Sequence, residues 1–86
     1  MRIETHKSYD KMWVKLNHKQ QLKVLATLKM FLGGQNGAKL RIHQLKGKYY
    51  PQYSISVSGD LHIHFLKIND DTIVLTMVGT HSQLYH

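Results

Sequence analysis

The sequence lacks cysteine altogether and has few acidic residues. Without cysteine the protein has no disulfide framework, no thiolate nucleophile and no cysteine zinc site. Only five aspartates and glutamates stand against 12 lysines and arginines, which gives a formal net charge of +7 at pH 7. A surface with this charge attracts a polyanion or an acidic protein.

Long hydrophobic runs are also missing, because no unbroken apolar stretch is longer than that of Ile73-Val74-Leu75. A membrane helix needs about 20 apolar residues and a signal peptide about 7 to 15, so we expect a cytoplasmic protein with no membrane partner. Hydrophobic residues still make up 42% of the 86 residues, and only one residue is proline. This composition indicates one folded domain over residues 1–86 rather than a disordered tail.

The first third of the chain has the apolar spacing of two amphipathic helices, preceded by an expected edge strand at residues 1–5. Ser8 is suited to cap the first helix, Asn17 ends it, and Gly33-Gly34 stops the second. The apolar residues expected to face a sheet are Tyr9, Met12, Trp13, Leu16, Leu22, Leu25, Leu28, Phe31 and Leu32. The lysines expected to point outward are Lys11, Lys15, Lys19, Lys23 and Lys29.

After an expected loop at residues 35–38, the sequence changes to short segments rich in β-branched and aromatic residues. We expect strands at residues 53–57, 61–68 and 72–78, with tight turns at residues 58–60 and 69–71. Such short turns require the strands to pair antiparallel.

Side chains alternate across a strand, so one face of the middle strand should be apolar. Leu61, Ile63 and Phe65 are expected to face the helices, while His62 and His64 face away from them. The predicted fold class is therefore α+β, with two N-terminal helices packed on a small, mainly antiparallel sheet as a two-layer sandwich.

A basic segment surrounds His43, with Arg41 on one side and Lys46 and Lys48 on the other. Metal-free cleavage of RNA needs a base for the 2′-hydroxyl proton, an acid for the departing 5′-oxygen, and cations around the phosphate. A histidine suits either proton role, because its unperturbed pKa is about 6.5. His43 is therefore a candidate catalytic residue beside three candidate phosphate ligands, and the structural alternative is a histidine at a strand edge.

A second histidine, His81, lies four residues before Tyr85. A helical turn after Thr80 would place both side chains on one face. Tyr85 could then stack on a base or hydrogen-bond a phosphate, and base stacking is worth about 1 to 3 kcal/mol. The structural alternative for Tyr85 is an aromatic ring that seals the sheet.

Four motifs between residues 39 and 85 resemble those of a known family. They are His43-Gln44-Leu45-Lys46-Gly47, Tyr53-Ser54-Ile55-Ser56-Val57, Gly59-Asp60, and Gly79-Thr80-His81-Ser82-Gln83-Leu84-Tyr85. In these motifs the chain is similar to the YafQ branch of the RelE/ParE toxin superfamily. That branch has H-x-L-x-G, a tyrosine-led strand, a G-D or P-D turn and G-T-H-x-x-L-[FY], whereas the helical half matches only in layout.

The resemblance implies an mRNA interferase, the toxin of a type II toxin–antitoxin system, which cuts messenger RNA on the ribosome and inhibits translation. It also implies a cognate antitoxin protein as partner, in a hetero-oligomeric complex. The family's catalytic histidines correspond to His43 and His81, its active-site aspartate to Asp60, and its terminal aromatic residue to Tyr85. The implied activity is that of an endoribonuclease that uses histidine acid–base catalysis without a metal or cofactor.

The sequence departs from the family pattern at four positions. Leu61 stands for a tryptophan, Ser56 for a histidine, and His62 and Met77 stand for arginines. A guanidinium is charged at any pH, whereas His62 is only partly protonated near neutrality, so RNA binding would depend on His62 together with the three cations around His43. A catalytically weak homologue that only binds an antitoxin is the alternative that these changes leave open.

Other functions and roles compete with this interpretation. A ParE-like toxin would poison DNA gyrase without chemistry of its own, although the histidine and tyrosine motifs speak against it. Gly59-Asp60 is also a common sequence in tight turns, which would give Asp60 a structural role. His62 and His64 have a spacing that can hold zinc with a third ligand, but no carboxylate or cysteine accompanies them at ligand spacing. We therefore expect no metal site.

Overall fold

The computed structural model describes residues 1–34 and 39–85, so the loop expected at residues 35–38 lies outside the described residues. The elements in chain order are β1 (Arg2–Thr5), α1 (Lys7–Trp13), α2 (His18–Leu32), β2 (His43–Gln44), a 3-10 turn (Gly47–Tyr49), β3 (Tyr53–Ser58), β4 (Leu61–Asn69), β5 (Thr72–Thr80) and α3 (His81–Leu84). No helix in the described part of the chain is long and apolar enough to cross a membrane.

The five strands form one mixed sheet in the order β1-β5-β4-β3-β2. β1 pairs parallel with β5, and all other neighbouring strands pair antiparallel. The predicted edge strand and the three predicted antiparallel strands are confirmed, with ends that shift by at most two residues. The short strand β2 was not predicted, because two residues are too few to show an alternating pattern. The α+β fold class with a mainly antiparallel sheet is confirmed.

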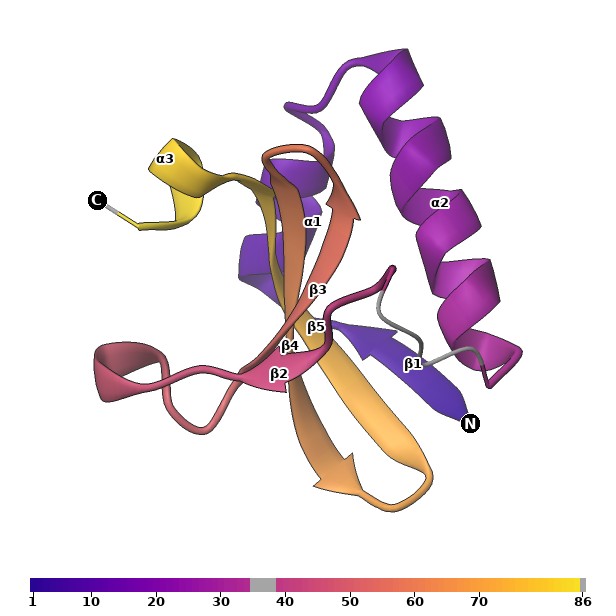
Figure 1. The fold of residues 1–86 in the computed structure, drawn as a ribbon, viewed down its shortest axis with the longest axis vertical. Helices are drawn as coiled ribbons and strands as arrows, with labels where there is room; N and C mark the ends of the chain where they lie inside the picture. The colour runs from indigo at the N-terminus through magenta and orange to yellow at the C-terminus, as the bar shows by residue number, and fades with distance from the viewer. Residues whose placement is uncertain (35–38, 86) are drawn as a thin grey trace.

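The sheet separates two groups of elements (Figure 1). α2 lies along one side of the strands, whereas α3 and the loop with the 3-10 turn lie on the other side. The core between α1, α2 and the sheet contains Tyr9, Val24, Phe31, Ile63 and Phe65, all of them buried. The opposite side of the sheet is therefore left for polar side chains, and we call it the open face.

The cap of α1 is His6 and not Ser8, so this prediction was wrong. Nδ1 of His6 accepts a hydrogen bond from the backbone N–H of Ser8 at 3.1 Å. The Ser8 hydroxyl donates instead to the carbonyl oxygen of Thr76 in β5 at 2.5 Å, and thus ties α1 to the sheet. Asn17 lies beyond the end of α1 and caps α2 through a capping box with Gln20.

The face of α2 that packs on the sheet differs from the predicted face. Its buried residues are Val24, Thr27 and Phe31. Three leucines expected in the core remain about half exposed, namely Leu22 at 54%, Leu25 at 53% and Leu32 at 49%. Leu25 and Leu32 each follow a buried residue, so they are rotated by about 100° away from the sheet. α2 carries two overlapping apolar stripes, and spacing alone does not decide which of them packs.

Candidate active site

Strand pairing places a row of polar side chains across the open face. His43 of β2 pairs with Ser54 of β3, Ser54 pairs with His64 of β4, and His64 pairs with Met77 of β5. Register partners on neighbouring strands point to the same face of a sheet. The pairing therefore brings the basic segment around His43 to the same surface as the two histidines of β4.

His62 lies on the same face, two residues from His64 along β4 and opposite Ser56 of β3. Burial is the largest cause that lowers the pKa of His62 below its usual 6.5. The Asp60 carboxylate acts in the opposite direction, while His81 and His43 lower this pKa further. His62 therefore interacts electrostatically with one carboxylate and two imidazoles.

The helical turn α3 brings His81 and Tyr85 together. A capping box holds the turn, in which the Thr80 N–H donates to Oε1 of Gln83 at 2.8 Å. The His81 backbone N–H donates to Asp60, at 3.1 Å from its carbonyl oxygen and 3.2 Å from Oδ1. The ring centroids of His81 and Tyr85 are 4.6 Å apart. The predicted turn after Thr80 and the shared face of the two rings are confirmed.

His43 has a defined tautomer in its neutral form. Its Nδ1 lies 2.8 Å from the carbonyl oxygen of Arg41, which only accepts, so Nδ1 carries the proton and Nε2 keeps a lone pair. The side chains of Arg41, Lys46 and Lys48 are exposed beside it. The Lys48 ammonium lies 5.2 Å from the centroid of the Tyr49 ring, which borders the site.

His64 and Tyr49 belong to the site, although sequence analysis gave neither of them a role in it. His64 is fully buried, and its Nε2 lies 2.9 Å from the Tyr85 hydroxyl. Burial, with smaller contributions from two neighbouring histidines, lowers the pKa of His64 to about 4. The Tyr49 ring contacts the Tyr85 ring edge-on, with centroids 5.1 Å apart, and the Tyr49 hydroxyl donates to the Leu84 carbonyl at 2.6 Å.

The strand pattern correctly predicted that His64 faces away from the helices, but it did not predict its burial. The rings that cover His64 come from the 3-10 turn and from the residue after α3, with Tyr49 at 5.8 Å and Tyr85 at 5.3 Å between centroids. Neither segment is adjacent to β4 in the sequence. The only signal available was the alternation His62-x-His64, which indicates the face and not its cover.

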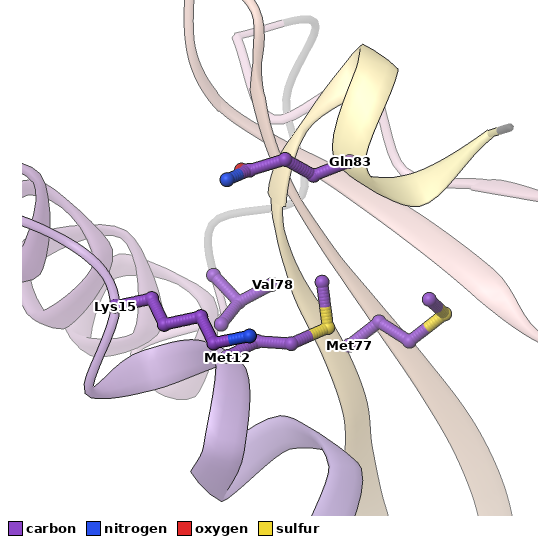
Figure 2. Close-up of a pocket in the computed structure, with 5 residues that line it drawn as sticks. All are labelled: Met12, Lys15, Met77, Val78 and Gln83. Carbon is purple, nitrogen blue, oxygen red and sulfur yellow. The ribbon is translucent and has the colours of Figure 1, made fainter.

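A cavity of about 370 Å³ lies next to α3, where α1 approaches β5. Figure 2 shows the Lys15 side chain extending across it toward Met12, with Gln83 of α3 on the opposite wall. Met77 and Val78 of β5 complete the lining. Met77 brings a thioether to a position where the family pattern has an arginine, and Lys15 is the charged residue among those that line this cavity.

No family model matches the sequence, and no curated protein matches it either. Solved structures do match over the whole chain. YafQ from Escherichia coli has a TM-score of 0.81 at 21% identity, covering 100% of both chains. A metal-bound toxin from Helicobacter pylori has a TM-score of 0.70 at 28% identity, covering 99% of each chain. RelE in the RelB–RelE antitoxin–toxin complex from Methanococcus jannaschii has a TM-score of 0.72 at 23% identity, covering 95% of this chain and 94% of its own.

The chain has the RelE/YafQ-like toxin fold. The resemblance inferred from four motifs thus agrees with the three-dimensional arrangement of the entire described chain. The structure of the Helicobacter pylori toxin is a metal-bound one. Within residues 1–34 and 39–85 no three histidine, aspartate or glutamate side chains converge to hold a metal ion.

Proposed function

We propose that this protein is the toxin of a type II toxin–antitoxin system and an endoribonuclease that cleaves messenger RNA on the ribosome and so inhibits translation. One observation carries the proposal: His43 is in register with His64 on the face that also carries His62, and His43, His81 and Asp60 all act electrostatically on His62. Three imidazoles that interact in this way can supply an acid, a base and a cation, which are the groups that metal-free RNA cleavage needs. The RelE/YafQ-like fold supports the same function.

His43 is the general base in this mechanism. Its Nδ1–H is held by the Arg41 carbonyl oxygen, so the lone pair of Nε2 is free to take the proton of a 2′-hydroxyl. The same hydrogen bond fixes the orientation of the ring. A positioned base of this kind contributes about 10² to 10⁴ in rate.

His81 is the general acid that protonates the departing 5′-oxygen. Asp60 holds its backbone at the start of α3, and Tyr85 packs against its ring. Burial and the nearby Tyr49 raise the pKa of Tyr85 above 10, so the Tyr85 hydroxyl stays protonated at neutral pH. Tyr85 can therefore donate a hydrogen bond to the phosphate while its ring stacks on a base.

Four cations hold the phosphate in this mechanism. Arg41, Lys46 and Lys48 are exposed on the segment around His43, and His62 adds a charge whenever it is protonated. These residues stabilise the negative charge that builds up on the phosphate in the transition state. No step of the mechanism requires a metal or another cofactor.

The second partner is an antitoxin protein, which joins the toxin in a hetero-oligomeric complex in the cytoplasm. The RelE structure that matches this chain comes from an antitoxin–toxin complex. A net charge of +7 favours an acidic partner, which would neutralise the RNA-binding surface while the toxin is silent. We take residues 1–86 as one toxin domain.

Primer extension on a defined messenger, with and without translating ribosomes, tests the proposed function. We expect cuts in the ribosome sample, and we expect His43→Ala and His81→Ala each to lower the cleavage rate by about 10² to 10⁴. Binding of the messenger should change little in these variants. The exposed His18 provides the control, because His18→Ala should cleave as the wild type does. Full cleavage by the double variant of His43 and His81 would overturn the mechanism.

A second candidate function is antitoxin binding without nuclease activity. It is favoured by Met77, which puts an uncharged side chain into the row of His43 and His64. This candidate predicts tight binding of an antitoxin, no cuts in either primer-extension sample and no effect on growth when the chain is expressed alone. Absence of cuts together with inhibited supercoiling by DNA gyrase would instead indicate a ParE-like toxin.

A further inference from the structure

His64 is the one histidine of the open face that RNA cannot reach. Its side chain is 0% exposed, because it lies under the rings of Tyr49 and Tyr85. Nε2 of His64 is 2.9 Å from the Tyr85 hydroxyl, whereas its buried Nδ1 has no hydrogen-bond partner among the described residues. A buried polar side chain of this kind needs an explanation, and its burial excludes direct contact with the substrate.

The two ring nitrogens of His64 decide the direction of its hydrogen bond. If Nε2 accepted the Tyr85 proton, the unpaired Nδ1 would be a buried N–H, and orphaned N–H groups are rarer in proteins than unpaired acceptors. We therefore assign the proton to Nε2, which donates to the Tyr85 oxygen. A side-chain hydrogen bond from Ser54 also lowers the pKa of Tyr85, as expected of a donor to the same oxygen. With two donors on its oxygen, the Tyr85 hydroxyl proton is free to point toward the open face.

A second hydrogen bond holds the neighbouring residue. The Tyr49 hydroxyl donates to the Leu84 carbonyl oxygen at 2.6 Å, so residues 84 and 85 are both held from beneath the turn. The Tyr85 ring in turn packs on the His81 ring, and the Tyr85 N–H donates to the His81 carbonyl oxygen at 2.9 Å. The position of His81 therefore depends on a ring whose hydroxyl is bound by His64.

We propose that His64 is a positioning residue, which binds the Tyr85 hydroxyl through Nε2–H, aims the phenol proton at the substrate phosphate, and through the Tyr85 ring orients His81. The role in cleavage rests on the proposed nuclease function. The last position of the family motif is either phenylalanine or tyrosine. A phenylalanine at residue 85 would give His64 no oxygen to bind, so the hydrogen bond proposed here depends on the tyrosine of this chain.

A double-mutant cycle on cleavage tests the proposal. His64→Phe keeps a buried ring but loses the donor, and Tyr85→Phe loses the oxygen. We expect each variant to lower kcat about tenfold, a coupling of about 1.4 kcal/mol, with KM changed less than about twofold. The double variant should be no slower than either single variant, because the hydrogen bond can be lost only once. His64→Gln places an amide N–H near the site of Nε2 and should recover most of the rate.

If His64 only stabilised the fold, His64→Phe would lower the melting temperature without producing this pattern of kcat values. Wild-type kcat in His64→Phe, or losses that multiply in the double variant, would overturn the proposal. If His64→Phe fails to fold, His64→Leu, which also removes the N–H donor, takes its place in the cycle with Tyr85→Phe. We expect the His64→Leu change to have little effect on kcat in the Tyr85→Phe background.

A second measurement keeps this proposal separate from the proposed function. Wild-type protein that cleaves no messenger would refute the nuclease function, while NMR still tests the positioning role. We expect the nuclear Overhauser contacts between the His81 and Tyr85 rings in the wild type to weaken in His64→Phe. Contacts of unchanged strength in that variant, or a His64 proton found on Nδ1, would overturn the positioning role whatever the cleavage assay shows.

Discussion

At the scale of single residues, His62 differs from the arginine of the family pattern in one decisive property, its protonation. Burial, His81 and His43 lower its pKa below 6.5 against the opposing effect of Asp60. With a pKa below about 6.5, less than about a quarter of His62 is charged at pH 7. In the proposed mechanism, the contribution of His62 to phosphate binding is therefore largest at low pH and is lost as the pH rises through this lowered pKa.

His62→Arg should make this contribution permanent. We expect single-turnover cleavage at pH 7 to rise at least about fourfold, since a charge present in under a quarter of the molecules becomes present in all of them. The wild type loses the His62 charge as the pH rises through the lowered pKa of His62, whereas the arginine keeps its charge. The cleavage rate of the variant relative to the wild type should therefore increase with pH. His18→Arg adds the same charge elsewhere as a control, and a rate ratio of His62→Arg to wild type that does not change with pH would contradict the role of His62.

His64 makes a different prediction, on stability. Its folded-state pKa is about 4, below the 6.5 of the unfolded chain. Between these values the unfolded chain binds a proton that the folded chain does not, so the free energy of unfolding decreases as the pH falls from about 6.5 to about 4. The full effect is about 3 kcal/mol, and it should be absent in His64→Phe. Urea unfolding at about pH 7 and about pH 4 measures it, with His18→Phe as an exposed control. A loss of stability as large in His64→Phe as in the wild type would show that His64 is not the residue responsible.

At the scale of elements, α3 depends on a glycine in the strand before it. A Cβ on Gly79 would lie 2.7 Å from Oε1 of Gln83, the atom that accepts the Thr80 N–H in the capping box. Gly79→Ala should displace this amide and cost about 1 kcal/mol, the usual worth of a helix cap. Thermal unfolding and cleavage should both report the change, because the same turn carries His81.

Gln83→Ala removes the same cap from the other side and is the matched variant. Its effect should not add to that of Gly79→Ala, since both changes disrupt one hydrogen bond. An additive loss of stability would show that the two changes act on separate interactions, and an unchanged melting temperature in Gly79→Ala would show that the contact is relieved at no cost.

The elements themselves were largely predictable from local patterns. The strands follow alternation and turn residues, α2 ends at Leu32 with Gly33 as its cap, and α3 follows Thr80. The errors arose where a tertiary contact decided the outcome. The apolar stripe of α2 that contains Val24 packs on the sheet, and the neighbouring apolar stripe does not. The Ser8 hydroxyl binds the Thr76 carbonyl oxygen and therefore does not cap α1.

The candidate site follows the same division. His43 and His81 were proposed from their neighbours in the sequence, and both act electrostatically on His62. The cover of His64 was not predictable, because its two rings come from segments about 15 and 20 residues away along the chain. Sequence patterns locate groups within one element, whereas burial on the open face depends on how distant loops close over it.

At the scale of the whole molecule, the net charge of +7 predicts that RNA binding depends steeply on salt. Arg41, Lys46 and Lys48 supply three of the phosphate contacts in the proposed mechanism. Their joint replacement by alanine should reduce the slope of log K against log salt by about 2, since each contact with single-stranded RNA contributes about 0.7. Fluorescence polarisation with labelled single-stranded RNA over a sodium chloride series measures this slope.

The lysines of the helical side provide the control for that experiment. Lys19, Lys23 and Lys29 are exposed, and all three lie on α2, on the other side of the sheet from α3. Their joint replacement by alanine makes the same change in net charge. An equal decrease of the slope in both triple variants would indicate a diffuse charge effect rather than contacts at the site.

The parallel pairing of β1 with β5 joins residues far apart in the sequence, with Arg2 opposite Thr72 and Thr5 opposite Leu75. During synthesis the amino-terminal part of a chain emerges first, so β1 has no strand to pair with until β5 has left the ribosome. The turn with His81 follows β5 and is exposed later still. In the proposed mechanism, a nascent chain therefore becomes able to cut messenger RNA only after β5 and His81 have left the ribosome that makes it.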